Sequence, residues 1–282
     1  MPELPEVEIT ARRLNTALAG AEVESALSPG MVAMKSVDPP LSALEGRELT
    51  GVRRIGKMLV VEFEGELSLL VHLMSAGRLQ VFEVRASLRD RRSRLLVRLA
   101  DGRELRLREF GTKQRAWAKL LRAGEVESDE MVAKLGPEAW PAPPLDELAA
   151  LIEQPRHLHP MLRDQRVIAG IGRSWVDEIL WEARLSPFKQ GADLQADEVQ
   201  RLHAGLDVLD RAIEHYEEVI GDMVPDKLPM PLRVHRRERE PCPRCGTNLE
   251  AVHFAERVTT YCPEEQTGGR VLKDRRLSRL LK

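Results

Sequence analysis

The pattern of apolar and polar positions changes twice along the chain. Between about residues 23 and 120, short runs such as KMLVVEFE, LSLLVHL and RELRLREF alternate apolar and polar positions and are separated by Gly, Asp or Ser turns. Before them, residues 6–18 carry apolar side chains at helical spacing. This order predicts one helix followed by an antiparallel β-sandwich or barrel.

From about residue 130 to residue 219 the apolar positions recur every three or four residues, which predicts helices. The Pro-rich segment 221–234 is predicted to be a linker. The last fifty residues hold CPRC, an alternating stretch and an Arg-rich tail. The predicted fold is α+β and multidomain, with a helix and β-sandwich at 1–125, helices at 130–225 and a β-hairpin module with a basic extension at 233–282.

Composition narrows the class of protein. Hydrophobic residues make up 43% and charged residues 31% of the 282 positions, which excludes disordered and fibrous chains. No apolar run approaches the roughly 18 residues of a membrane span, and the acidic start PELPEVE does not resemble a secretory signal. We therefore expect a cytoplasmic protein with no membrane partner.

The net charge of −2 conceals an asymmetry, because residues 233–282 contain 12 basic and 7 acidic side chains. A basic end on a mildly acidic body favours a local contact with nucleic acid, and a solvated charged tail is the alternative. The same region holds all three cysteines, Cys242, Cys245 and Cys262. An odd number without a signal peptide favours a metal site or free thiols over disulfides.

The N-terminus could carry chemistry. Removal of Met1 would expose Pro2 as a secondary amine, and α-amino groups have pKa values of about 7.7–8.0, so part of the population is neutral and nucleophilic near pH 7. Attack on a sugar C1′ would give an iminium, with Glu3 and Glu6 beside it as general acid and base. The alternative is an acidic helix start punctuated by proline. A retained Met1 would turn Pro2 into an amide that cannot react.

Five short motifs follow one another along the chain, and together they are more informative than any one of them. They are PELPEVE at 2–8, Lys57 in IGKMLV, HLMSAGRL at 72–79, DQRVIAGIG at 164–172, and CPRC followed by Cys262. Over nearly the whole chain they resemble the formamidopyrimidine-DNA glycosylase (Fpg/Nei) family, and PELPEVE is closer to the Fpg branch than to the PEGPE of the Nei branch. The resemblance implies a DNA repair enzyme, both glycosylase and AP lyase, that acts as a monomer on duplex DNA with a damaged base or abasic site.

The resemblance also implies roles at the sugar and in the gap left by a flipped nucleotide. Pro2 would be the nucleophile, Glu3 would move protons at the sugar, Glu6 would orient the site and Lys57 would bind phosphate. Met74, Arg108 and Phe110 would fill the gap. An ordinary turn lysine and a core methionine are the structural alternatives for Lys57 and Met74. The family commonly has arginine where this chain has Glu109. A carboxylate next to the opposite base would change the preference for the partner base and repel nearby phosphate.

In the helical part the resemblance implies a helix–two-turn–helix. Its glycine turn at Gly172 would bring backbone N–H groups to a phosphate. Arg173 replaces the usual asparagine, and Gln165 matches a phosphate-binding position. Arg257, at the tip of the C-terminal hairpin, would grip the phosphates beside the flipped nucleotide.

The resemblance further implies one structural zinc ion. CPRC has the C-x2-C spacing of a zinc knuckle, and the family repeats this motif 16 residues later. Here the second motif reads Cys262-Pro-Glu-Glu265, so Cys242, Cys245, Cys262 and Glu265 are the predicted ligands. His253 is a second candidate for the fourth ligand. The alternative is a hairpin that folds by packing, with three free thiols.

Two rival functions stay open. One is a Nei-type glycosylase for oxidised pyrimidines. The segment from Glu214 to Cys242 is shorter than in typical family members and includes the loop expected to cap 8-oxoguanine, which favours formamidopyrimidines or oxidised pyrimidines. The other is a lesion-binding or abasic-site-binding protein with little catalysis, although the intact Pro2-Glu3 pair argues against it.

Overall fold

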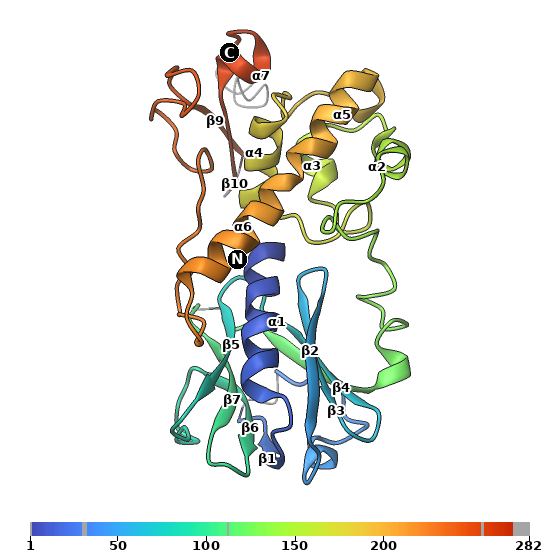
Figure 1. The fold of residues 1–282 in the computed structure, drawn as a ribbon, viewed down its shortest axis with the longest axis vertical. Helices are drawn as coiled ribbons and strands as arrows, with labels where there is room; N and C mark the ends of the chain where they lie inside the picture. The colour runs from blue at the N-terminus through green and yellow to red at the C-terminus, as the bar shows by residue number, and fades with distance from the viewer. Residues whose placement is uncertain (1, 30–32, 112, 255–256, 273–282) are drawn as a thin grey trace. The chain divides into compact units, whose positions relative to one another are not determined.

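The computed structural model describes residues 2–29, 33–111, 113–254 and 257–272 (Figure 1). The chain divides into two compact units. The first unit comprises Met1–Lys134 and Ile213–Pro229, and the second comprises Leu135–Ala212 and Met230–Lys282. Among the described residues, no helix combines the length and the hydropathy that crossing a bilayer requires.

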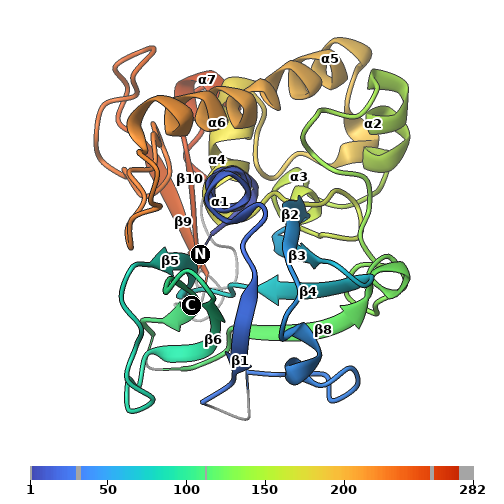
Figure 2. The same ribbon diagram turned by 60° about the horizontal axis from the view of Figure 1, so that its bottom comes forward.

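The first unit contains helix α1 (Leu4–Leu18) and two four-stranded sheets (Figure 2). One sheet has the order β1 (Val23–Leu27), β6 (Ser93–Leu99), β7 (Glu104–Glu109), β5 (Gly77–Phe82). The other has the order β2 (Leu49–Ile55), β3 (Met58–Phe63), β4 (Leu67–His72), β8 (Trp117–Arg122). All neighbouring strands are antiparallel, so the predicted helix and β-sandwich are confirmed.

One apolar core joins α1 to both sheets. The helix contributes Val7, Ala11, Leu14 and Leu18, which lie on one face because they are spaced by three or four residues. Leucines and valines from every strand of the two sheets complete the core. The first turn of the chain is therefore held in place by hydrophobic packing, at roughly 1.5–3 kcal/mol for each large side chain buried.

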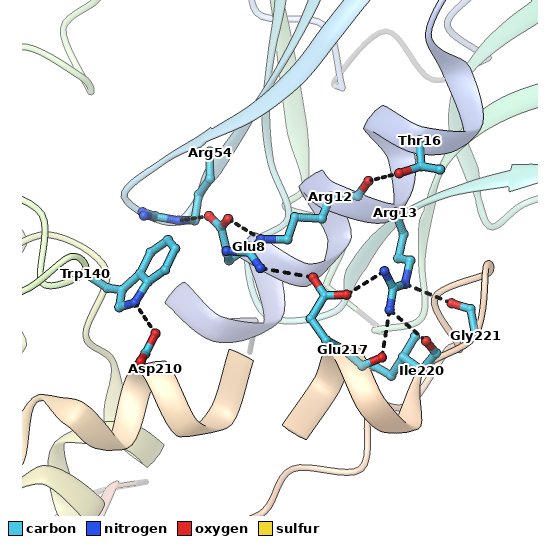
Figure 3. A network of polar contacts seen from close by, with 10 residues as sticks. All are labelled: Glu8, Arg12, Arg13, Thr16, Arg54, Trp140, Asp210, Glu217, Ile220 and Gly221. Carbon is cyan, nitrogen blue, oxygen red and sulfur yellow. Dashed lines mark hydrogen bonds and ion pairs between the residues drawn. The ribbon is translucent and has the colours of Figure 1, made fainter. Parts of the chain in front are cut away.

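The end of helix α6 (Asp207–Val219) also packs on α1 in the first unit. The Arg13 guanidinium donates to three carbonyls at this end, those of Glu217 (3.1 Å), Ile220 (3.0 Å) and Gly221 (3.1 Å) (Figure 3). Arg12 forms ion pairs with Glu8 (2.8 Å) and Glu217 (3.1 Å). These contacts satisfy carbonyls that a helix end leaves without partners and fix α6 to α1.

The second unit combines helices with the C-terminal hairpin. Its elements are α2 (Leu145–Ile152), α3 (Leu158–Leu162), α4 (Arg173–Glu182), α5 (Ala196–Gly205), the first half of α6, β9 (Glu250–Phe254), β10 (Arg257–Tyr261) and α7 (Pro263–Thr267). Trp140 Nε1 donates to Asp210 of α6 (2.8 Å; Figure 3). Packing thus groups residues 135–212 with residues 230–282, while residues 213–229 belong to the first unit. The predicted division into parts 130–225 and 233–282 stays a prediction.

Two buried carboxylates of α4 hold the segment that leads to the hairpin. Glu178 accepts the backbone N–H groups of residues 233, 234 and 235 at 2.8–3.0 Å. Asp177 binds His235 Nδ1 (2.6 Å), His159 Nε2 (3.1 Å) and the N–H of Thr260 in β10 (3.1 Å). These bonds fix β10 against α4, because an unpaired carboxylate would be costly at this depth.

We expect Leu14→Ala to lower the free energy of unfolding by about 2–5 kcal/mol, because it leaves a cavity between α1 and the sheets. Leu14 is only 3% exposed. Urea unfolding followed by circular dichroism measures the change. The matched control is Leu88→Ala, at a residue that is 61% exposed, which should change stability by less than about 0.5 kcal/mol. Equal losses in the two variants would contradict the assignment of α1 to the core.

Candidate active site and metal centre

The structure brings Pro2, Glu3 and Glu6 together at the buried start of α1. Pro2 precedes the helix, and Glu3 is its N-cap residue. The Oε2 atom of Glu6 accepts a hydrogen bond from the Glu3 N–H at 2.8 Å. The two carboxylate residues are 1% and 2% exposed, so water is largely excluded from them. A nucleophile at Pro2 would therefore have two buried proton-transfer groups within one helical turn.

Tyr216 of α6 is part of the same cluster, although the sequence did not indicate it. Its hydroxyl donates to Glu6 Oε1 at 2.8 Å, and the residue is fully buried. Burial raises the pKa of Tyr216 above its ordinary value, and the nearby Glu6 charge adds to the effect. The hydroxyl therefore stays protonated and acts as a donor. No sequence signal pointed to it, because 210 residues separate the partners.

Lys57 lies in the tight turn between β2 and β3, and its charge acts on His72 at the end of β4. Burial, with a smaller contribution from Lys57, lowers the pKa of His72 to about 4. His72 is therefore neutral at pH 7 and stacks on Trp117 at 5.7 Å between ring centroids. Its Nδ1 accepts the N–H of Met74 at 2.9 Å.

Met74 occupies a strained position in the turn between β4 and β5. Its φ is +50°, in the left-handed region that side chains rarely adopt. The turn is tight, since a Cβ on Gly77 would lie 2.4 Å from the Leu73 carbonyl oxygen. Met74 is partly exposed there and not buried as a core methionine would be.

Arg108 and Phe110 lie beside this turn, because the Phe110 N–H donates to the Ala76 carbonyl at 3.1 Å. Phe110 is 39% exposed, and the Arg108 guanidinium lies 4.7 Å from the centroid of its ring. Arg108 also pairs with Asp226 (3.0 Å). The structure thus brings together the three residues predicted to fill the gap in DNA.

Glu109, predicted to lie next to the opposite base, has a buried side chain. Glu109 is 3% exposed and points into the unit, where its Oε1 accepts the N–H groups of Arg115 (2.7 Å) and Ala116 (3.0 Å). Side chains alternate along a strand, so the neighbours Arg108 and Phe110 point away from it. Its role is to shape the loop that precedes β8.

In the second unit, the turn before α4 carries Gln165, Gly170, Gly172 and Arg173. Gly172 is the N-cap residue of α4, and Arg173 is exposed at its first position. Gln165 donates to the carbonyls of residues 163 and 171 (both 2.9 Å) and accepts the Gly170 N–H (3.0 Å). It therefore shapes the turn, and a phosphate contact would require it to exchange one of these bonds.

Arg257 is the first residue of β10 and pairs with Phe254 across the hairpin. This position agrees with the predicted hairpin tip. Its side chain lies outside the part of the structure that is described, so the predicted phosphate contact stays a prediction.

Cys242, Cys245 and Cys262 form a candidate metal centre, with their sulfur atoms within 4.8 Å of one another. Burial acts to raise the pKa of Cys242, but hydrogen bonds from the N–H groups of Cys245 and Arg244 outweigh it and lower that pKa. Burial raises the pKa of Cys262 to about 12. A divalent cation would compensate thiolates held this closely, and thiolate sulfur is the ligand that structural zinc sites use most.

Glu265 does not lie in this group of ligand atoms. Its carboxylate pairs with Arg244 (2.7 Å) and Arg184 (3.5 Å). His253, the other candidate, pairs with Glu238 (2.7 Å) and is exposed. The three thiolates fit zinc, while the structure brings neither predicted fourth ligand to them.

Comparison with known proteins identifies three domain types along the chain. The formamidopyrimidine-DNA glycosylase N-terminal domain matches residues 1–113, the H2TH domain of the same enzymes matches residues 135–223, and a zinc finger found in FPG and IleRS matches residues 239–264. The zinc-finger match and the three thiolates together indicate one structural zinc ion.

Similar proteins cover almost the whole chain. A formamidopyrimidine-DNA glycosylase of Roseiflexus sp. strain RS-1 is 35% identical over 283 residues, which covers 94% of this chain and 100% of that protein. The crystal structure of the MutM (Fpg) protein from Thermus thermophilus has a TM-score of 0.80 at 31% identity and covers 94% of this chain and 98% of its own. Lactococcus lactis Fpg bound to DNA containing N7-benzyl-Fapy-dG has a TM-score of 0.83 at 27% identity. The match covers 94% of this chain and 100% of that chain.

We expect His72 to make stability depend on pH. The unfolded chain binds a proton at His72 near pH 6.5 and the folded chain only near pH 4, so the contribution of neutral His72 is complete above about pH 6.5 and is lost as the pH falls towards 4. His72→Gln keeps an acceptor for Met74 and does not titrate. As the pH falls from 7 to 5, the unfolding free energy of wild type should therefore decrease relative to that of this variant. A constant difference would refute the effect.

We expect elemental mass spectrometry of the purified protein to find one zinc ion per chain. The Cys262→Ala variant should lose this zinc and should have a lower melting temperature. Glu265→Gln should keep the metal, because the Glu265 carboxylate pairs with Arg244. Loss of zinc from Glu265→Gln would instead restore the sequence-based prediction of a carboxylate ligand.

Proposed function

The chain belongs to the formamidopyrimidine-DNA glycosylase family, and we propose that it excises oxidised or ring-opened purines from duplex DNA and then cuts the strand at the resulting abasic site. The observation that carries the proposal is the buried cluster at the start of α1, where Glu3 directly follows Pro2 and Glu6 lies in the first helical turn. A protein that only bound lesions would have no use for such an N-terminal amine.

The proposed reaction begins once Met1 has been removed. The Pro2 nitrogen forms a bond to C1′ of the damaged nucleotide as the bond from C1′ to the base breaks, and the proton that the secondary amine loses goes to the departing base. Glu3 gives a proton to the ring oxygen of the sugar, and the opened sugar carries an iminium. Loss of the C2′ proton then expels the 3′ phosphate, and a second elimination expels the 5′ phosphate. Hydrolysis of the remaining iminium frees Pro2.

Side chains from both units are proposed to hold the DNA. Met74, Arg108 and Phe110 would occupy the gap that the flipped nucleotide leaves, since an apolar wedge offsets part of the few kcal/mol that unstacking costs. Lys57, Gln165, Arg173 and Arg257, with the backbone N–H groups at Gly172, would bind phosphates. Each phosphate neutralised releases counterions, so binding should weaken as salt rises.

A ring-opened purine is the substrate class best supported. The Roseiflexus relative is named for formamidopyrimidine, and solved structures of Lactococcus lactis Fpg contain Fapy-dG or an abasic site in DNA. Zinc would hold the C-terminal hairpin, and with it Arg257, through Cys242, Cys245 and Cys262. It would take no part in the reaction at the sugar.

The proposal is tested by borohydride trapping on duplexes that carry formamidopyrimidine, 8-oxoguanine, thymine glycol or an abasic site. Mass spectrometry first establishes that Pro2 is the N-terminal residue. We expect a covalent adduct, formed fastest on formamidopyrimidine and the abasic site, and a strong loss of it in Pro2→Gly. The same variant should still bind the DNA.

The other outcomes are equally informative. Fastest trapping on thymine glycol would assign the chain to the pyrimidine branch. DNA binding without any adduct, from protein with a processed N-terminus, would leave a damage-binding protein and refute the enzyme.

A further inference from the structure

Glu6 is held from two sides by groups that are far apart in the sequence. Its Oε2 accepts the N–H of Glu3, which is the nitrogen of the peptide that joins Pro2 to Glu3. Its Oε1 accepts the hydroxyl of Tyr216. Both bonds are 2.8 Å long and buried. A chain of two hydrogen bonds thus runs from α6 to the peptide next to the N-terminal residue.

The Tyr216 ring has little freedom to move. It is fully buried and packs with Ile9 of α1 and Ile220. The turn that follows is fixed by Arg13, which donates to the carbonyls of Ile220 and Gly221 (Figure 3). Arg13 also pairs with Glu217, the residue after Tyr216, at 2.6 Å. The hydroxyl is therefore presented to Glu6 from a rigid support, as precise placement of a reacting group requires.

We propose that Tyr216 is a positioning residue for the N-terminal amine: through Glu6 it fixes the Glu3 peptide, and so the direction in which Pro2 faces the sugar. This inference rests on the proposed function, because it assigns Tyr216 a part in that reaction. In this proposal Tyr216 acts through Glu6 and not by contact with the substrate. Without its hydroxyl, Glu6 loses a donor in a buried site and the carboxylate can turn away from the Glu3 N–H.

The geometry predicts an effect on rate and not on DNA affinity. The residues proposed to contact DNA do not include Tyr216, and Phe at this position keeps the ring that packs on Ile9 and Ile220. Misplacement of a nucleophile by a fraction of an ångström slows a reaction strongly, whereas binding depends on contacts elsewhere. A merely structural tyrosine would instead lower the melting temperature and leave the rate of the folded protein unchanged.

The experiment measures single-turnover excision at saturating DNA, adduct trapping on an abasic site, DNA affinity and melting temperature for Tyr216→Phe. We expect a fall of about tenfold or more in both rates, with affinity within about twofold of wild type. The matched control is Tyr261→Phe in the second unit, which loses a buried hydroxyl that accepts the Leu272 N–H (2.6 Å). Its rates should match those of wild type.

A double-mutant cycle tests whether Tyr216 acts through Glu6. In a Glu6→Gln background, Tyr216→Phe should slow the reaction by less than about twofold, because the chain of bonds is already altered. A full tenfold effect in that background would overturn the inference. Unchanged rates in the Tyr216→Phe single variant, or an equal loss in Tyr261→Phe, would overturn it as well. If wild type itself forms no adduct, the proposed function fails; if wild type traps normally and Tyr216→Phe does too, only this inference fails.

Discussion

The structure of the first unit depends on the burial of α1. Its apolar face, with Leu14 and Leu18, packs into the core of both sheets, while its opposite end holds Glu3 and Glu6. A chain terminus normally frays, because few contacts oppose its conformational entropy. Here hydrophobic packing along the fifteen residues of α1 supplies that opposition and keeps the buried Pro2 at the start of the helix in place.

Hydrogen bonds and ion pairs then fix the positions of the elements that hydrophobic packing brings together. In the first unit Arg13 binds the end of α6, and Tyr216 reaches Glu6. In the second unit Asp177 and Glu178 bind the segment before the hairpin and β10 itself. Each of these groups is buried or partly buried, where an unpaired donor or acceptor is costly, so the pairs specify one arrangement among several that packing alone would allow.

Much of this could be predicted from the sequence. Alternation of apolar positions and helical spacing predicted the α1–sandwich order, because those periods follow from local backbone geometry. CPRC and Cys262 predicted a thiolate metal site. The spacing of the first two cysteines, and the presence of all three in one short segment, can be seen in the sequence alone. The burial of Glu109 was not predicted, because its carboxylate binds the backbone N–H groups of Arg115 and Ala116 across a loop, and the spacing of residues does not show such a contact.

Motifs and periods within short stretches of the chain were enough to predict the family, the order of the elements, the residues at the start of α1 and the three thiolates. Three contacts became visible only in the folded chain. Tyr216 donates to Glu6, Gln165 makes hydrogen bonds within its own turn, and Glu265 pairs with Arg244. The reason is the same in each case. A side chain's partner is chosen by which buried group lacks a hydrogen bond or a counter-charge once the chain has folded, and spacing along the chain does not record that choice.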